Sequence, residues 1–215
     1  MVDPYLRQSA LAHLGLVGHP APLDGAAGVT LGEHAFEGIV NLRANGGDKA
    51  AQDAVRAALG VGLPLEANTV ETGDSARAFW LGPDEWWMVT AERDPEAGPR
   101  AAAKLRAALA GHHAAVTDVS ESRACIQIRG PKARAVLQKG CPLDFHASVF
   151  TAGMCAQSHL AKVSATIYLA VDESTGGKDD NAPVFDVYVP RSCAEYAWRW
   201  LVDAGREYGV AIAAV

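Results

Sequence analysis

The sequence predicts an α+β fold of two fused split-βαβ halves that follow an irregular N-terminal arm. From residue 36 onward, segments with the period of a half-buried strand alternate with segments of helical period. The same order of elements then occurs a second time, with glycine or proline at most boundaries. Residues 1–34 contain Pro4, Pro20 and Pro22 and show little periodicity, apart from one short helical turn near SALAHL. We therefore expect an arm over 1–34 and a folded module over 35–215.

The first half, about residues 35–119, begins with GIVNLRAN (38–45), whose alternation of apolar and polar residues predicts a strand. The next segment is predicted to be a helix, with Asp48 as its N-cap and Gly60 just beyond its end. Turn residues then separate three strands, LEANTVET, ARAFWLG and EWWMVT. A second helix over roughly 97–110 and the strand AAVTDV complete this half.

The second half, about residues 120–215, repeats this order, starting with the strand RACIQIRG. Gly130-Pro131 is predicted to open a helix that Gly140 stops, since proline suits the first helical position. HLAKVSATIYLAVD and PVFDVYV read as two strands joined by the polar loop ESTGGKDDNA. A capping box of Ser192 and Glu195 predicts the start of the last helix, which precedes the strand GVAIAAV. Both halves therefore have the β-α-β-β-α-β order of ferredoxin-like units.

Composition and charge exclude several classes of function. The 215 residues are 49% hydrophobic and 20% charged, with a formal net charge of −6. Nucleic-acid binding as the main role is disfavoured because neutralising phosphates requires a basic face. We find neither an apolar run long enough to span a membrane nor the pattern of a signal peptide. The four cysteines are widely spaced, so we expect reduced thiols in a cytoplasmic protein.

One short stretch is rich in residues that bind metals or act as acids, bases and nucleophiles. It contains Cys141, Asp144, His146, Cys155 and His159. Structural zinc usually needs closely spaced ligand pairs, and the two cysteines lie far apart. A Cys–His nucleophile needs a stabilised thiolate, whereas Cys141 follows a helix end, where the helix dipole raises a thiol's pKa. We favour a buried thiol at a helix end, with Asp144 bonding backbone N–H groups of the loop.

Other candidates also have a structural alternative. Asp118 and Ser120 suit either a polar ligand at the junction of the halves or a turn cap, which we favour. Adjacent Trp86 and Trp87 must face opposite sides of a strand, so we expect one in the core and the other exposed at a partner interface. Cys193 beside the last helix is interpreted as a packed thiol. STGGKDD lacks phosphate-loop spacing and reads as a hairpin tip.

Several blocks of the sequence, in order over nearly the whole chain, carry a family resemblance. They are SALAHL, WLGPDEWW, VTDVSESR, GPKARAVLQKGCPLDFH, F-x-x-G-x-CAQ-x-x-x-AK (Phe150 to Lys162) and the RS-C-A-E-Y segment. As a set, they closely resemble the gamma subunit of heterotetrameric sarcosine oxidase.

The resemblance implies a subunit without an active site of its own. The complex would demethylate sarcosine oxidatively to glycine, pass the one-carbon unit to tetrahydrofolate or release it as formaldehyde, and form hydrogen peroxide. The alpha subunit would carry NAD and a folate-binding domain, and the beta subunit would carry FAD and a covalent FMN. The delta subunit would hold zinc. The gamma subunit would carry no catalytic, cofactor or metal residues and would dock mainly on alpha. Its fold resembles the folate-binding module of aminomethyltransferases.

Two other functions remain open from the sequence. One is a stand-alone folate-binding or one-carbon-transfer protein that uses a cleft between the halves near Asp118. The other is a metalloprotein that uses the five reactive residues of the stretch described above.

Overall fold

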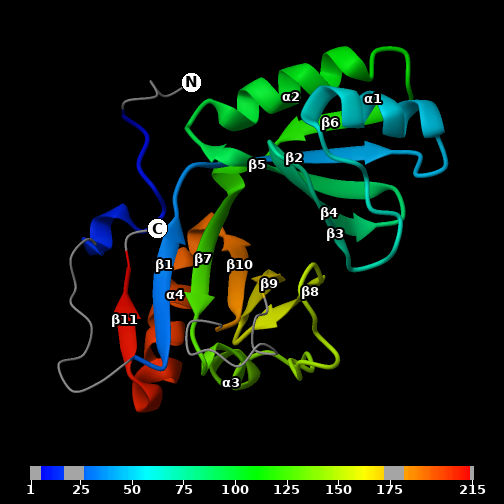
Figure 1. The fold of residues 1–215 in the computed structure, drawn as a ribbon. Helices are drawn as coiled ribbons and strands as arrows, with labels where there is room; N and C mark the ends of the chain where they lie inside the picture. The colour runs from blue at the N-terminus through cyan, green and yellow to red at the C-terminus, as the bar shows by residue number, and fades with distance from the viewer. Residues whose placement is uncertain (1–5, 17–26, 172–181, 214–215) are drawn as a thin grey trace. The chain divides into compact units, whose positions relative to one another are not determined.

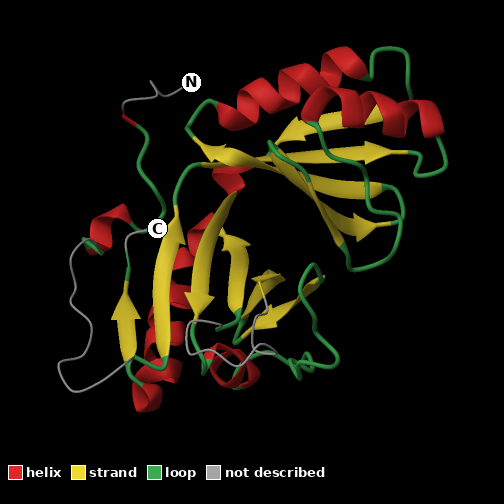
Figure 2. Ribbon diagram, in the orientation of Figure 1, coloured by secondary structure: helices red, strands yellow, loops and turns green. Residues whose placement is uncertain are grey.

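The computed structural model describes residues 6–16, 27–171 and 182–213, which combine helices with two β-sheets (Figure 2). The chain divides into two compact units. Unit 1 comprises Met1–Arg7 and Phe36–Ser122, and unit 2 comprises Gln8–Ala35 and Arg123–Val215. The predicted α+β class is confirmed, and each unit is described separately below.

Unit 1 is a five-stranded sheet with two helices on one face (Figure 1). In chain order its elements are β2 Glu37–Ala44, α1 Lys49–Leu59, β3 Val70–Thr72, β4 Ala76–Gly82, β5 Glu85–Arg93, α2 Ala97–Ala108, β6 Ala114–Asp118 and the 3₁₀ turn η3 Ser120–Ser122. The strand order is β3-β4-β5-β2-β6. Without the edge strand β3, this is a split βαβ unit in which β2 lies between β5 and β6.

The predicted caps of α1 are confirmed. The Asp48 side chain accepts a hydrogen bond from the backbone N–H of Ala51, and Gly60 ends the helix in the left-handed conformation with φ 68°. Ala51, Val55 and Leu59 recur at helical spacing and are buried against the sheet. Local sequence and core packing therefore favour the same helix.

Unit 2 is a six-stranded sheet with the order β11-β1-β7-β10-β9-β8. Its elements are the 3₁₀ turn η2 Ala12–Leu14, β1 Val29–His34, β7 Arg123–Arg129, α3 Ala133–Gln138, β8 Cys155–Leu160, β9 Val163–Val171, β10 Val184–Pro190, η4 Arg191–Cys193, α4 Ala194–Gly205, η5 Arg206–Tyr208 and β11 Val210–Ile212. β7, α3, β9, β10, α4 and β11 reproduce the split βαβ order. β1 is inserted between the first and last strands of that unit, antiparallel to β7 and parallel to β11.

The insertion of β1 corrects the expectation of an irregular segment over residues 1–34. Val29 and Leu31 of β1 are fully buried in the core of unit 2. The upstream prolines and the lack of periodicity suggested an irregular segment. However, β1 pairs with β7 and β11, which lie far away in the sequence. The local pattern of residues 29–34 therefore does not predict this strand.

Two further local predictions in unit 2 are wrong. HLAKVSATIYLAVD is not one strand, because β8 and β9 form a hairpin in which Leu160 pairs with Val163. Ala161 in its tight turn has φ 52°, a conformation for which glycine or asparagine is the usual signal. The capping box of Ser192 and Glu195 does not form, since α4 begins at Ala194 without a side-chain cap.

On α4, Ala197, Trp198, Leu201 and Ala204 are buried in the core, while Trp200 lies partly exposed at its edge. Most of the loop ESTGGKDDNA, including STGGKDD, lies outside the described residues. Among the described residues, no helix is both long and apolar enough to cross a membrane.

Candidate functional site

The two adjacent tryptophans do not provide an exposed surface for a partner. Trp86 is 0% exposed and Trp87 is 6% exposed. Trp86 belongs to the core of unit 1, where its indole N–H donates to the carbonyl of Pro64 at 2.8 Å. The expectation that one ring is exposed is therefore wrong, because residues on both faces of β5 are buried.

The stretch of reactive residues is held by local hydrogen bonds. The backbone N–H of buried Cys141 donates to the carbonyl of Leu137 at the end of α3, at 3.0 Å. An Asp144 carboxylate oxygen accepts from the backbone N–H of His146 at 2.8 Å, as predicted. The His146 ring in turn lies 2.7 Å from the Ser148 hydroxyl. These side chains stabilise the turn that leaves α3.

Arg134 of α3 anchors the loop that follows this turn. Its guanidinium donates to the carbonyl of Phe145 and, at 3.1 Å, to that of Phe150. It also lies over the ring of Phe185, 5.4 Å from the centroid. The three phenylalanine rings pack together with centroids 5.4 to 6.1 Å apart. GPKARAVLQKGCPLDFH is therefore the sequence of α3 and of the anchored turn that follows it. No pattern in the sequence indicated the role of Arg134.

Cys155 and His159 lie on β8, an edge strand of unit 2. Cys155 is buried, whereas His159 is exposed. Across the described ranges, the five residues of this stretch do not form a group whose ligand atoms lie close enough together to share one ion. Cys193 is a free cysteine of intermediate exposure.

Asp118 and Ser120 cap the turn at the end of β6, as favoured from the sequence. One Asp118 carboxylate oxygen accepts from both the Ser120 backbone N–H at 3.0 Å and the Ser120 hydroxyl at 2.6 Å. The Ser120 hydroxyl oxygen accepts from the backbone N–H of Ile39 at 2.9 Å. This arrangement joins the turn to β2 within unit 1.

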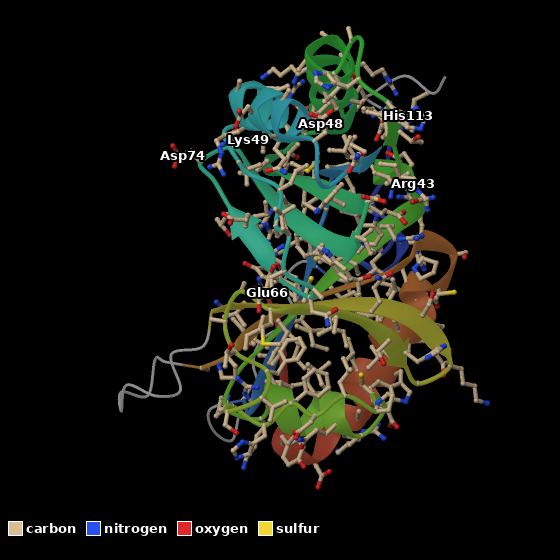
Figure 3. The ribbon with its side chains drawn as sticks, turned by 90° about the vertical axis from the view of Figure 1, so that its right-hand side faces the viewer. Arg43, Asp48, Lys49, Glu66, Asp74 and His113 are labelled. Carbon is tan, nitrogen blue, oxygen red and sulfur yellow. The ribbon has the colours of Figure 1, made fainter. Side chains whose placement is uncertain are left out.

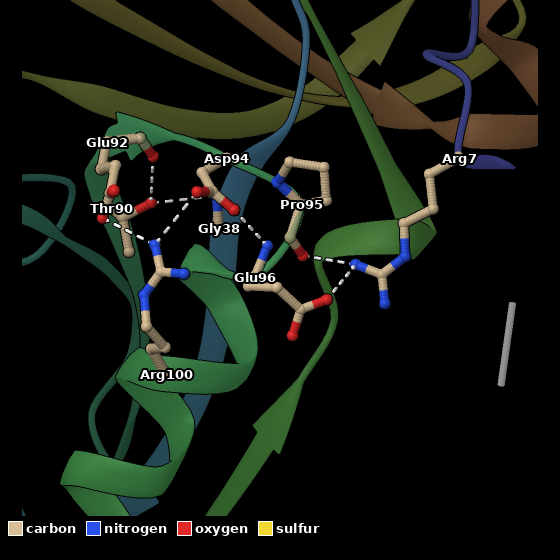
Figure 4. A network of polar contacts seen from close by, with 8 residues as sticks. All are labelled: Arg7, Gly38, Thr90, Glu92, Asp94, Pro95, Glu96 and Arg100. Atoms are coloured by element: carbon tan, nitrogen blue, oxygen red, sulfur yellow. Dashed lines mark hydrogen bonds and ion pairs between the residues drawn. The ribbon is translucent and has the colours of Figure 1, made fainter. Parts of the chain in front are cut away.

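A polar network next to this turn fixes the start of α2 (Figure 4). An Asp94 carboxylate oxygen accepts from the backbone N–H of Glu96 at 2.7 Å and so satisfies a donor at the helix start. Arg100 contacts Asp94 at 3.5 Å and Glu92 at 2.8 Å. The backbone hydrogen bond from Glu96, followed by the Arg100 charge, lowers the pKa of Asp94.

Arg7 attaches the described N-terminus to the same corner of unit 1. Its guanidinium donates to the carbonyl of Pro95 and lies 3.4 Å from a carboxylate oxygen of Glu96, as Figure 4 shows. The Arg7 side chain is only 15% exposed. This contact is structural, since each polar group supports the backbone of the β5–α2 connection.

The arm residues that follow are held on unit 2 by acidic side chains. Glu33 of β1 accepts from the Ser9 hydroxyl at 2.7 Å and from the backbone N–H of Leu11 at 3.1 Å. Leu11 is fully buried in the core of unit 2. Glu195 of α4 lies 3.0 Å from the His13 ring. The SALAHL block is thus an anchored segment that sequence reasoning recognised only as a short turn.

The anchored arm, α4 and β11 form a groove on unit 2, hereafter called the arm groove. Its volume is about 420 Å³, and it is lined by Leu14, Leu16, Trp198, Arg199, Val202, Asp203, Arg206 and Ile212. Apolar side chains form most of the lining, while the charged ones come from exposed positions of α4 and η5. The arm groove suits an apolar contact with a polar rim, and nothing in the sequence pattern marked it.

Comparison with known proteins links the chain to one family. The model of the sarcosine oxidase, gamma subunit family matches residues 43–207. The sarcosine oxidase subunit gamma of Corynebacterium sp. (strain U-96) is 32% identical over 213 residues, covering 98% of this chain and 96% of the relative. The subunit gamma of an Arthrobacter species is 32% identical, covering 94% and 92% of the two chains.

Solved structures agree with this relationship. A chain of the heterotetrameric sarcosine oxidase from Corynebacterium sp. U-96, solved with pyrrole 2-carboxylate, has a TM-score of 0.78 at 32% identity and covers 94% of this chain and 96% of its own length. The glycine cleavage system aminomethyltransferase T from Bartonella henselae shares the fold, with a TM-score of 0.60 at 12% identity over 86% of this chain and 48% of that one. The predicted likeness to the aminomethyltransferase fold is therefore confirmed, and the chain belongs to the sarcosine oxidase gamma subunit family.

Proposed function

We propose that this chain is the non-catalytic, structural gamma subunit of a heterotetrameric sarcosine oxidase. The observation that carries the proposal is the match, along nearly the full length of both chains, to a component of a heterotetrameric enzyme. The local roles of the reactive side chains also support it. Asp118, Asp144 and Cys141 each belong to a turn or helix end that the fold requires.

In this proposal the chemistry takes place in the other subunits. Sarcosine, oxygen and water would give glycine, formaldehyde and hydrogen peroxide, with tetrahydrofolate as the alternative one-carbon acceptor. FAD, FMN, NAD and zinc would be held by the alpha, beta and delta subunits, and alpha would make the main contact with this chain. We place the complex in the cytoplasm, where the four free cysteines of this chain would stay reduced.

The test is purification of the native assembly. The chain is tagged at its chromosomal locus, and the purified material is analysed by native mass spectrometry and flavin absorbance. We expect one copy of this chain together with three different subunits and bound flavin. Recovery of the chain as a stable monomer without a flavoprotein would refute the proposal.

The rival function is stand-alone folate binding or one-carbon transfer, which the shared aminomethyltransferase fold keeps open. Asp118, the residue first considered for it, is already bonded twice by Ser120. Titration of the isolated chain with tetrahydrofolate by calorimetry separates the two functions. Stoichiometric binding by the isolated chain would favour the rival, whereas the structural proposal expects no heat of binding.

A further inference from the structure

We propose that the arm groove, together with the open edge of β11, is the docking site for an extended segment of a partner subunit. The segment has apolar side chains that enter the groove and a carboxylate that reaches Arg206. This inference rests on the proposed function and names the surface through which the chain would join its complex.

The first support is the position of β11 in the sheet of unit 2. β11 stands at one end of the strand order, and Figure 1 shows it beside β1 at the margin of the sheet. Its inner edge pairs with β1 from Val210 to Ile212, and within the described residues no strand pairs with its outer edge. Such an edge offers backbone N–H and C=O groups to an added strand, which is a recurring way of binding peptides.

The second support is the apolar surface beside that edge. Ile212 belongs both to β11 and to the lining of the arm groove, so the backbone edge and the apolar surface are continuous. Leu14, Leu16 and Val202 pack against the core of unit 2 but remain only partly buried. In an added strand, alternate side chains point to the same face, so one set of apolar residues can enter the groove.

The third support is the charge at the rim. The Arg199 and Arg206 side chains are 70% and 85% exposed in a chain whose net charge is −6. Arg199 is bound to Glu195 at 2.7 Å, whereas the Arg206 guanidinium is 3.7 Å from Asp203 in an exposed pair. An exposed pair at that distance contributes little and is easily exchanged. A carboxylate of the partner can therefore form a shorter, bidentate pair with Arg206.

The arm supplies one wall of this site and is fixed in advance. Leu11 is fully buried, and Glu33 and Glu195 hold Ser9 and His13 on either side of it. Leu14 and Leu16 follow directly from this anchored segment. A wall that is already ordered lowers the entropic cost of binding an extended segment.

The test uses the assembled complex with a photoreactive residue in the groove. Asp203, which lines the groove and leaves Arg206 in place, is replaced by p-benzoylphenylalanine. Ala103, an exposed residue of α2 in unit 1, receives the same replacement as a control. After irradiation, mass spectrometry identifies the attached peptide. We expect position 203 to attach to one apolar, acid-containing segment of another subunit, and position 103 not to attach to that segment.

A second variant tests the chemistry of the site. Val202→Glu places a carboxylate in the apolar groove, so we expect association with the partner subunits to weaken at least tenfold. Ala103→Glu adds the same charge on an exposed helix surface and is expected to leave association unchanged. If Val202→Glu fails to fold, the crosslinking result at position 203 still decides the question.

Each other outcome overturns the inference. A crosslink from position 203 to residues 17–26 of the same chain, or to a second copy of the chain, would show a different occupant. If the complex assembles normally while position 203 attaches to no partner, the docking site is refuted and the proposed function stands. If the chain never joins a complex, both are refuted.

Discussion

Replacing Gly98 by alanine tests the close packing of α2 on its own sheet. Gly98 is the second residue of α2, and an added Cβ atom would lie 2.1 Å from the Ser120 hydroxyl oxygen and 2.8 Å from an Asp118 carboxylate oxygen. Gly38 of β2 faces the same contact, because a Cβ atom added to it would lie 2.4 Å from the backbone nitrogen of Gly98. The two glycines therefore allow the helix start to contact β2 directly.

The size of the effect follows from three opposing contributions. Alanine in a helix gains up to about 1 kcal/mol over glycine. Forcing an extra methyl group into a packed site costs about 1–3 kcal/mol. Moving the Ser120 hydroxyl away also weakens its bond to the Ile39 backbone N–H, which is worth about 0.5–1.5 kcal/mol. We therefore expect Gly98→Ala to lower the free energy of unfolding by about 2 kcal/mol.

Urea unfolding followed by tryptophan fluorescence measures this change. Gly82→Ala is the matched control, because its Cβ atom would lie at an ordinary 3.8 Å from the Cβ of Glu85. Removing the obstructing hydroxyl by Ser120→Ala should make the Gly98→Ala change less costly, by at least about 0.5 kcal/mol. If the free energy of unfolding of Gly98→Ala is equal to or higher than that of the wild type, this account of the packing is wrong.

Three more variants test other parts of the structure. Arg134→Met removes the donor to two loop carbonyls and should lower the free energy of unfolding by about 2–4 kcal/mol, with an intermediate effect for Arg134→Lys. Hydrogen exchange in the loop between α3 and β8 should become faster in Arg134→Met, and an unchanged exchange rate would contradict the anchoring role. Asp48 is the N-cap of α1 (Figure 3), and its pKa in the folded state is lowered from 3.8, chiefly by the hydrogen bond with His112. The charged carboxylate therefore stabilises the fold above pH 3.8, and this stabilisation is lost as the pH falls through the lower pKa of the folded state. The stability difference between the wild type and Asp48→Asn, which keeps a capping side chain, should therefore shrink in acid denaturation series below about pH 4, and a constant difference would refute the assignment. Trp86→Phe leaves the buried Pro64 carbonyl without its donor and should cost about 1–3 kcal/mol in thermal or urea unfolding, whereas a purely interfacial tryptophan would leave stability unchanged.

The sequence predicted most elements because their signals are local. Asp48 and Gly60 mark the two ends of α1, and the order of elements identified both split-βαβ halves. β1 was missed because its stability comes from pairing with β7 and β11, far away in the chain. The β8–β9 turn was missed because Ala161 takes a left-handed conformation that tertiary context enforces on a residue with no intrinsic preference for it.

The candidate site was less predictable for the same reason. The turn roles of Asp144 and Asp118 follow from short-range hydrogen bonding, so they were recognised from sequence. Alternation along β5 correctly placed Trp86 and Trp87 on opposite faces but gave no measure of burial on either face. The arm groove joins residues from both ends of the chain, and only the folded structure brings Leu16 and Ile212 together.

The central claim is that this chain contributes structure and no chemistry to a sarcosine oxidase. The most direct test is to assemble the complex with a variant in which Cys141 and Cys155 are replaced by serine, Asp144 by asparagine, and His146 and His159 by glutamine. These changes remove the reactive groups and keep polar side chains in the turn, and sarcosine turnover is measured per bound flavin. We expect turnover per assembled complex to equal that of the wild type, while omission of the chain abolishes assembly. Loss of turnover in a fully assembled complex, or full assembly and activity without the chain, would contradict the claim.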